Sequence, residues 1–180
     1  VMTKLKDARE FITEKALVTI GRSFNSVNLG LESIGVNVEK GRIEVNERME
    51  TGVRGVYAIG DVTGKMCLAH VASAQGIAAV SNALGKDVKM DYSLIPAGIF
   101  TDPEIASVGL REKDAEARGI KVNIGRFPYA ASGKAMGMGE TEGFVQILVE
   151  EGTDKILGCA IVGAHETDLI GDAALAMKAG

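Results

Sequence analysis

The sequence predicts an α/β unit of short buried strands and one long helix, followed by an α+β unit built on an antiparallel sheet. Two apolar runs, residues 17–20 and 56–59, each stop at a glycine, which is typical of buried strands in an α/β fold. Beyond Asp91 the pattern changes to short strands joined by tight turns, which indicates antiparallel pairing. We therefore place a boundary near residues 91–93.

The first unit has few expected elements. The run at 17–20 ends at Gly21 and has so little chain before it that its sheet is expected to lie in upstream sequence. One short strand is expected over 42–45. An alanine-rich helix is expected over 67–84, with Gly85 at the position that commonly follows a helix end. One face of this helix carries Leu68, Val71, Ala72, Gln75 and Ala79.

The second unit is expected to alternate strands and helices. The hairpin is the clearest element, because two apolar runs flank a polar loop that contains Gly152. The final helix places Leu169, Ala173 and Met177 on one side. The expected strands cover 95–100, 105–108, 121–129, 144–149 and 156–162, and the expected helices cover 111–118 and 166–179.

Composition excludes several classes of protein. The 180 residues carry a formal net charge of −4, which gives no electrostatic reason to expect nucleic acid or an anionic membrane as a partner. No apolar run approaches the roughly 18 residues that a membrane span needs. Two cysteines, Cys67 and Cys159, are too few for a disulfide framework, so a cytoplasmic location is expected. Both are interpreted as small buried residues.

The segment from Thr51 to Asp61 is the strongest candidate for a binding site. An apolar run that ends in Gly60-Asp61 places one carboxylate at the edge of a sheet where α/β folds bind ligands. Gly60 lets the backbone approach a ligand closely, and Asp61 can accept hydrogen bonds from sugar-type hydroxyl groups. The pair Gly-Asp alone also fits an ordinary turn aspartate, and the residues leave both interpretations open.

The whole stretch Thr51-Gly52-Val53-Arg54-Gly55-Val56-Tyr57-Ala58-Ile59-Gly60-Asp61 resembles the second flavin-binding motif of the pyridine nucleotide–disulfide oxidoreductases, T-x-x-x-(V/I)-(Y/F)-A-x-G-D. The resemblance implies an FAD-binding, Rossmann-like domain in which Asp61 contacts the ribityl chain. Cys67-Leu68-Ala69-His70 resembles the M-L-A-H that begins a flavin-facing helix in the lipoamide dehydrogenases of this family. It implies that these four residues adjoin FAD and that His70, otherwise an ordinary helix histidine, is a flavin neighbour rather than an acid or base.

Two further segments extend the resemblance. Residues 17–31 are similar to the exit from the family's NAD-binding domain, with Gly21 against the nicotinamide cofactor and Phe24 in place of the usual proline. Residues 99–110 are similar to the opening of its interface domain. The resemblance therefore implies that 1–22 end the NAD-binding domain, 23–92 form the C-terminal part of the FAD-binding domain, and 93–180 form the interface (dimerisation) domain.

The family's catalytic motifs are not found in these 180 residues. The sequence contains no redox C-x-x-x-x-C, no G-x-G-x-x-G and no H-x-H-P-T-x-x-x-x-E. His165 precedes the final helix and is expected to be a surface or near-cap residue rather than a base. We therefore expect no catalytic residue and no metal ligand in this chain. In the family, the H-x-H-P-T-x-x-x-x-E motif would come just after the last residue of this sequence.

The resemblance implies the function of the intact enzyme. It would oxidise dihydrolipoamide with NAD⁺ through a redox disulfide and FAD, act as a homodimer through 93–180, and serve the lipoyl domains of 2-oxo acid dehydrogenase complexes. Glutathione reductase, mercuric reductase and soluble transhydrogenase are alternatives within the family. The alternative from another class of protein is that the chain is a stable, non-catalytic module, in essence an interface domain that dimerises. Without the resemblance, residues 93–180 are only an α+β unit.

Overall fold

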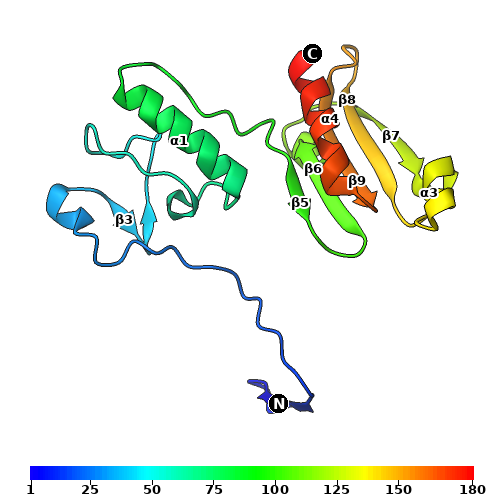
Figure 1. Cartoon of the computed structure of the whole chain (residues 1–180), viewed down its shortest axis with the longest axis horizontal. Coiled ribbons are helices and arrows are strands. Elements are labelled where there is room, and N and C mark those ends of the chain that lie inside the picture. Colours follow the sequence, from blue (N-terminus) through cyan, green and yellow to red (C-terminus); the bar gives the residue numbers. More distant parts are fainter.

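The computed structural model describes all residues from 1 to 180. Figure 1 shows a small N-terminal hairpin, a unit built around α1 (Ala69–Ala83), and a unit in which α4 (Glu166–Ala179) lies on a sheet. An extended segment joins the hairpin to the α1 unit, and a second extended segment leads from α1 into the sheet.

The N-terminal segment does not form the predicted buried strand. Its only regular structure is an antiparallel pair, β1 (Met2–Lys4) and β2 (Glu10–Ile12), and every residue from 1 to 23 is exposed. The prediction of a strand over 17–20 is wrong for this chain, where Leu17 is 88% and Ile20 94% exposed. A buried strand needs neighbouring strands to pair its backbone, and none lies beside these residues.

The α1 unit contains little sheet. β3 (Val38–Glu39) pairs with β4 (Arg42–Ile43), so the strand expected over 42–45 is confirmed in its first half. The strand expected over 56–59 is reduced to one bridge between Tyr57 and Glu50, and Ile59 is 42% exposed. Like the run at 17–20, the run at 56–59 has no further strand to pair with.

The core of the α1 unit forms around Met49, which is fully buried. The helix contributes Val71, Gln75, Ala78 and Ala79. Its predicted end is confirmed, because Gly85 adopts φ +85° and its N–H donates to the Asn82 carbonyl at 2.9 Å. The other buried apolar residues of this core are Val36, Ile43, Val45 and Ala58.

The second unit is a five-stranded, wholly antiparallel sheet. The strands lie in the order β5-β6-β9-β8-β7, and the predicted hairpin is confirmed as β8 and β9, with Val145 opposite Ile161. Their bounds are β5 (Ala97–Ile99), β6 (Glu104–Gly109), β7 (Val122–Pro128), β8 (Phe144–Glu150) and β9 (Ile156–Gly163).

Three helices accompany this sheet. α2 (Glu112–Ala117) and α4 confirm the two predicted helices. A third helix, α3 (Gly133–Met138), was not predicted, because its six glycine- and methionine-rich residues show no apolar period. α4 packs on β5, β6 and β9 and buries Ile170 and Met177, whereas Leu169 is 45% exposed.

No helix in the structure combines the length and the apolar character needed to cross a membrane.

Candidate functional site

The candidate site begins at the turn that carries Asp61. Gly60 adopts φ +76° and ψ −158°, a conformation open almost only to glycine, and Asp61 begins the short 3-10 turn η2 (Asp61–Thr63). The Thr63 hydroxyl donates to the Gly60 carbonyl at 2.8 Å, which fixes the turn from within. Asp61 itself is exposed, so its carboxylate is free to accept hydrogen bonds from a ligand.

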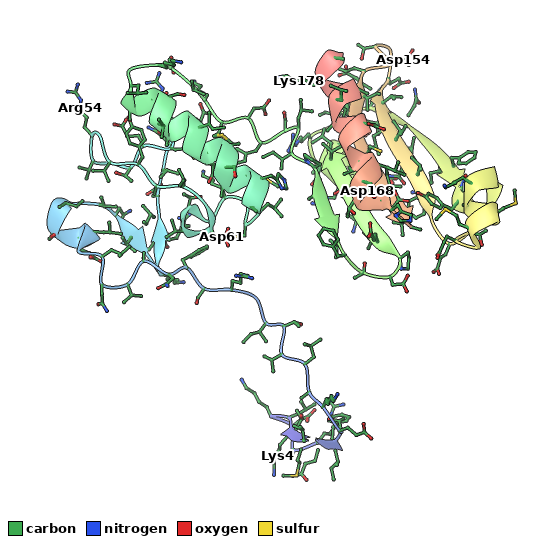
Figure 2. The ribbon with its side chains drawn as sticks, viewed as in Figure 1. Lys4, Arg54, Asp61, Asp154, Asp168 and Lys178 are labelled. Carbon is green, nitrogen blue, oxygen red and sulfur yellow. The ribbon has the colours of Figure 1, made fainter.

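The start of α1 lies against this turn. A Cβ placed on Gly60 would lie 3.5 Å from the Ala72 Cβ, in the first turns of the helix. Figure 2 shows Asp61 below the end of the helix at which α1 begins. Leu68 occupies the N-cap and no side chain caps the helix, so the N–H groups of the first turn remain available to a negatively charged or hydrogen-bond-accepting group.

Asp61 and Gly21 line the same cavity, although one was predicted as a flavin contact and the other as a nicotinamide contact. The cavity has a volume of about 560 Å³, within the range of small-molecule and cofactor sites. It also brings two polar side chains of the extended segment, Ser23 and Asn25, to the Asp61 turn. Its lining consists of Gly21, Arg22, Ser23, Phe24, Asn25, Asp61 and Val62.

The four residues expected at the helix start lie next to one another but differ in exposure. Cys67 is exposed, which corrects its interpretation as a buried residue: it precedes the helix, before the chain turns inward, and so has no core to enter. Leu68 is half-buried and Ala69 is exposed. The His70 Nε2 atom lies 3.0 Å from the Pro96 carbonyl oxygen, just before β5.

One residue near this site was recognised in the sequence only as part of a helix face. Gln75 is fully buried; its Oε1 accepts the Gly60 N–H at 2.6 Å, and its Nε2 donates to the Tyr92 hydroxyl at 2.9 Å. An amide among Val71, Ala72 and Ala79 is the signal that could have found it, because a polar group on an apolar face needs a buried partner.

The carboxyl group with the most strongly raised pKa, that of Glu166, does not line the cavity of Asp61 and Gly21. Glu166 is fully buried, and burial together with the neighbouring Glu104 carboxylate raises its pKa to about 7. The Tyr129 hydroxyl donates to Glu166 Oε1, whereas Oε2 is buried without a partner. Hydrogen bonds from Thr167 lower the pKa of Glu104. Cys159 is buried as predicted, and burial raises the pKa of its thiol.

Two sequence models of one protein family match this chain. The model described as "Pyridine nucleotide-disulphide oxidoreductase" matches residues 1–76, and the one described as "Pyridine nucleotide-disulphide oxidoreductase, dimerisation domain" matches residues 95–180. The chain belongs to the pyridine nucleotide-disulphide oxidoreductase family. The predicted fold class, an FAD-binding α/β portion followed by an α+β dimerisation domain, is thereby confirmed.

Within this family the chain is similar to dihydrolipoyl dehydrogenases. It is 47% identical to that of Chlamydia pneumoniae over 163 residues, which are 90% of the chain and 35% of the relative. It is 47% identical to that of Bacillus subtilis over 92% of the chain and 35% of the relative, and 42% identical to the mitochondrial protein of Mus musculus over 91% and 32%. The chain therefore spans about a third of the length of these relatives.

Solved structures share the fold. LpdA from Mycobacterium tuberculosis superimposes with a TM-score of 0.92 at 32% identity, covering 98% of this chain and 39% of LpdA. The HOCl-induced flavoprotein disulfide reductase RclA from Escherichia coli gives a TM-score of 0.87 at 24% identity, covering 99% of this chain and 42% of RclA. The likeness to RclA shows the fold alone.

Proposed function

We propose that this chain is part of an FAD-dependent dihydrolipoyl dehydrogenase that oxidises dihydrolipoamide with NAD⁺ through a redox disulfide. The observation that carries the proposal is the cavity that Asp61 and Gly21 share, together with the packing of the turn before Asp61 against Ala72 of α1. It occurs in a chain that is 41–47% identical to dihydrolipoyl dehydrogenases over at least 90% of its length.

The residues present fit FAD. Asp61 is an exposed carboxylate beside a glycine that lets a ligand approach the backbone, which suits the hydroxyl groups of a ribityl chain. The uncapped first turn of α1, from Ala69, offers N–H groups and the positive end of the helix dipole to the electron-rich edge of a flavin. When bound, FAD would supply the two-electron chemistry, and these residues would bind it and stabilise negative charge.

Gly21 fits a nicotinamide neighbour. It adopts φ +100°, and a Cβ built there would meet no atom within 4 Å, so the space beside it is open. We infer that residues 1–22 complete an NAD-binding domain, that 23–92 belong to the FAD-binding domain, and that 93–180 form the dimerisation domain. In support of that last boundary, the first core reaches Tyr92 and the second begins to gather neighbours at Leu94.

The sheet face opposite α4 supports homodimer formation through 93–180. Ile105, Val162 and Phe144 are cross-strand neighbours on β6, β9 and β8 and therefore point to one face of the sheet. The adjacent row of Ala106, Ile161 and Val145 belongs to the core beneath α4. Ile105 is 38% and Phe144 37% exposed, so this apolar row is available for a second subunit.

We further propose that the intact enzyme acts in the cytoplasm on the lipoyl domains of 2-oxo acid dehydrogenase complexes. The lipoyl-domain proposal rests on the dihydrolipoyl dehydrogenase relatives. The cytoplasmic location rests on the two cysteines, which are too few for a disulfide framework.

The decisive experiment uses the intact protein that contains this chain, assayed for NAD⁺-dependent oxidation of dihydrolipoamide and for FAD retained after gel filtration. Asp61→Asn removes the charge of one hydrogen-bonding group, so we expect about tenfold or greater weakening of FAD binding. Asp154→Asn, in the β8–β9 loop, is the matched control and should retain FAD fully. Equal FAD retention by both variants would contradict the role of Asp61.

Substrate choice separates the alternatives within the family. If the intact protein turned over glutathione disulfide or mercuric ion in place of dihydrolipoamide, it would be assigned as a glutathione or mercuric reductase. Hydride exchange between NADH and NADP⁺ without a disulfide would assign it as a transhydrogenase.

The 180 residues by themselves are expected to act as a dimerisation module. The β5–β9 sheet and α4 have their own apolar core, so this part can fold without the rest of the enzyme, and the exposed Ile105 and Phe144 give it a surface for association. We expect light scattering to show a dimer and NADH-dependent lipoamide reduction to be absent, since the sequence contains no redox cysteine pair and no His-Pro motif. A well-behaved monomer, or measurable reduction, would contradict these expectations.

A further inference from the structure

Gln75 is placed to control the backbone of the Asp61 turn. Its side chain is 0% exposed, on the inward face of α1, and its Oε1 accepts the Gly60 N–H at 2.6 Å. The Gly60 N–H belongs to the Ile59–Gly60 peptide, so the bond fixes the backbone one peptide unit before Asp61, the proposed flavin contact. Without an acceptor, the Gly60 N–H would be a buried donor with no partner.

The Gly60 conformation makes such a restraint necessary. At φ +76° and ψ −158° Gly60 has a conformation that glycine adopts without strain, but glycine can adopt many other conformations as readily. Gln75 holds the N–H and Thr63 holds the carbonyl of the same residue, at 2.6 and 2.8 Å. The two bonds restrain both sides of Gly60, and Gln75 alone does so from a separate element, the helix that offers its first turn to the flavin.

The amide of Gln75 is itself oriented by a second buried bond. Its Nε2 donates to the Tyr92 hydroxyl at 2.9 Å, and the Tyr92 hydroxyl lies 3.8 Å from the Met49 sulfur. Tyr92 belongs to the segment that leads from α1 to the second unit. The acceptor oxygen of Gln75 is therefore directed towards Gly60 by a contact from the end of the α1 unit.

We propose that Gln75 is a positioning residue for the flavin site: it holds the Ile59–Gly60 peptide, and through it the conformation of Gly60, so that the Asp61 carboxylate faces the cavity that it shares with Gly21. The proposal rests on the proposed function for its ligand but not for its geometry. Gln75 is buried behind the turn, so it acts through Gly60 and does not contact the ligand.

The first test measures amide hydrogen exchange of Gly60 by NMR in the 180-residue chain. Gln75→Leu removes the acceptor, and the Gly60 exchange rate should rise at least tenfold. Gln75→Glu keeps an acceptor oxygen, and Tyr92 can donate to it, so protection should return to within about threefold of the parent. Gln146→Leu removes the other glutamine, which lies on β8 and accepts from Arg126, and should leave Gly60 unchanged.

The second test titrates riboflavin into the same variants and the intact protein with FAD, following flavin fluorescence. Gln75→Leu should weaken flavin binding about as much as Asp61→Asn. The variant that combines these two substitutions should bind flavin no more weakly than either alone. Gln75→Glu should bind flavin with the affinity of the parent. Unchanged exchange at Gly60 in Gln75→Leu would overturn the proposal, as would unchanged flavin affinity despite faster exchange.

The two hypotheses fail in different ways. If no flavin binds even to the intact protein, the proposed function fails, and the Gly60 exchange rates still decide whether Gln75 positions the turn. If flavin binds and Gln75→Leu leaves the Gly60 exchange rate as in the parent, only the positioning role is lost.

Discussion

Glu166 opens α4 with a fully buried carboxyl group that accepts a hydrogen bond from Tyr129. Burial and the Glu104 carboxylate raise its pKa from 4.5 to about 7. Between those two values the folded state keeps a proton that the unfolded state has released, so the contribution of Glu166 to stability is fully present below about pH 4.5 and is lost as the pH rises through 7. The group faces Glu104, Thr167 and Tyr129, with His165 and Asp168 on neighbouring surface positions.

Glu166→Gln should remove this pH dependence. Glutamine stays neutral and still accepts from Tyr129, so the Tm of the variant should exceed that of the parent at pH 8, and the difference should shrink towards pH 5. The two proteins differ only at position 166, so the difference between the two Tm curves isolates Glu166. Glu142→Gln, at an exposed position, is the control and should give a constant difference near zero. A constant gap for Glu166→Gln would contradict the shifted pKa.

At the level of single residues, sequence reasoning proposed Asp61, Gly21 and the start of α1, and the structure gathers them around one turn and one cavity. The resemblance to a known motif made this possible, because Gly-Asp alone has a commoner interpretation as a turn. It did not identify the role of Gln75. The partners of a buried amide lie fifteen and seventeen positions away in the chain, and only the packed structure shows them.

At the level of elements, α1, α2, α4 and the hairpin were predicted well, whereas α3 was missed and the two isolated strands were predicted poorly. α4 has the predicted bounds, and α1 ends at the predicted glycine, because helix bonds and caps are local. The runs at 17–20 and 56–59 have strand composition but lack the neighbours that would pair them. Strand formation depends on contacts that local sequence does not supply.

Two glycine substitutions test the helix ends and interiors separately. Gly85 has φ +85° and open space around its Cβ position, so Gly85→Ala should cost about 1 kcal/mol through backbone strain alone. Gly171 lies inside α4 with equally open space, so Gly171→Ala should stabilise by about 0.5–1 kcal/mol. Urea unfolding measures both. Equal effects of the two alanines would contradict the left-handed conformation at Gly85.

At the level of the whole molecule, the chain has two apolar cores with no residue in common. One surrounds Met49 beneath α1, and the other lies between α4 and the β5–β9 sheet. The extended segment that joins the two units adds few contacts, among them the one between His70 and Pro96. Such an arrangement predicts that the units unfold independently.

Met49→Ala and Leu148→Ala test this independence. Both side chains are almost fully buried, at 0% and 1% exposure, and each truncation should cost about 2–5 kcal/mol. Met49→Ala should lower only the transition of the α1 unit, and Leu148→Ala only that of the sheet, where Leu148 lies on β8. Calorimetry or residue-resolved hydrogen exchange would show this. One transition lowered equally by both variants would contradict independent unfolding of the two units.

The sequence alone determined the two-part organisation, the helix boundaries, the antiparallel hairpin and the motif that points to a flavin, since each depends on local periodicity, turn residues or a short contiguous pattern. Tertiary structure decided which apolar runs became strands, that Cys67 is exposed, that Gly21 lies beside Asp61, and that Glu166 and Gln75 are buried with particular partners. These features depend on contacts between residues far apart in the chain, where pairing and burial follow from packing.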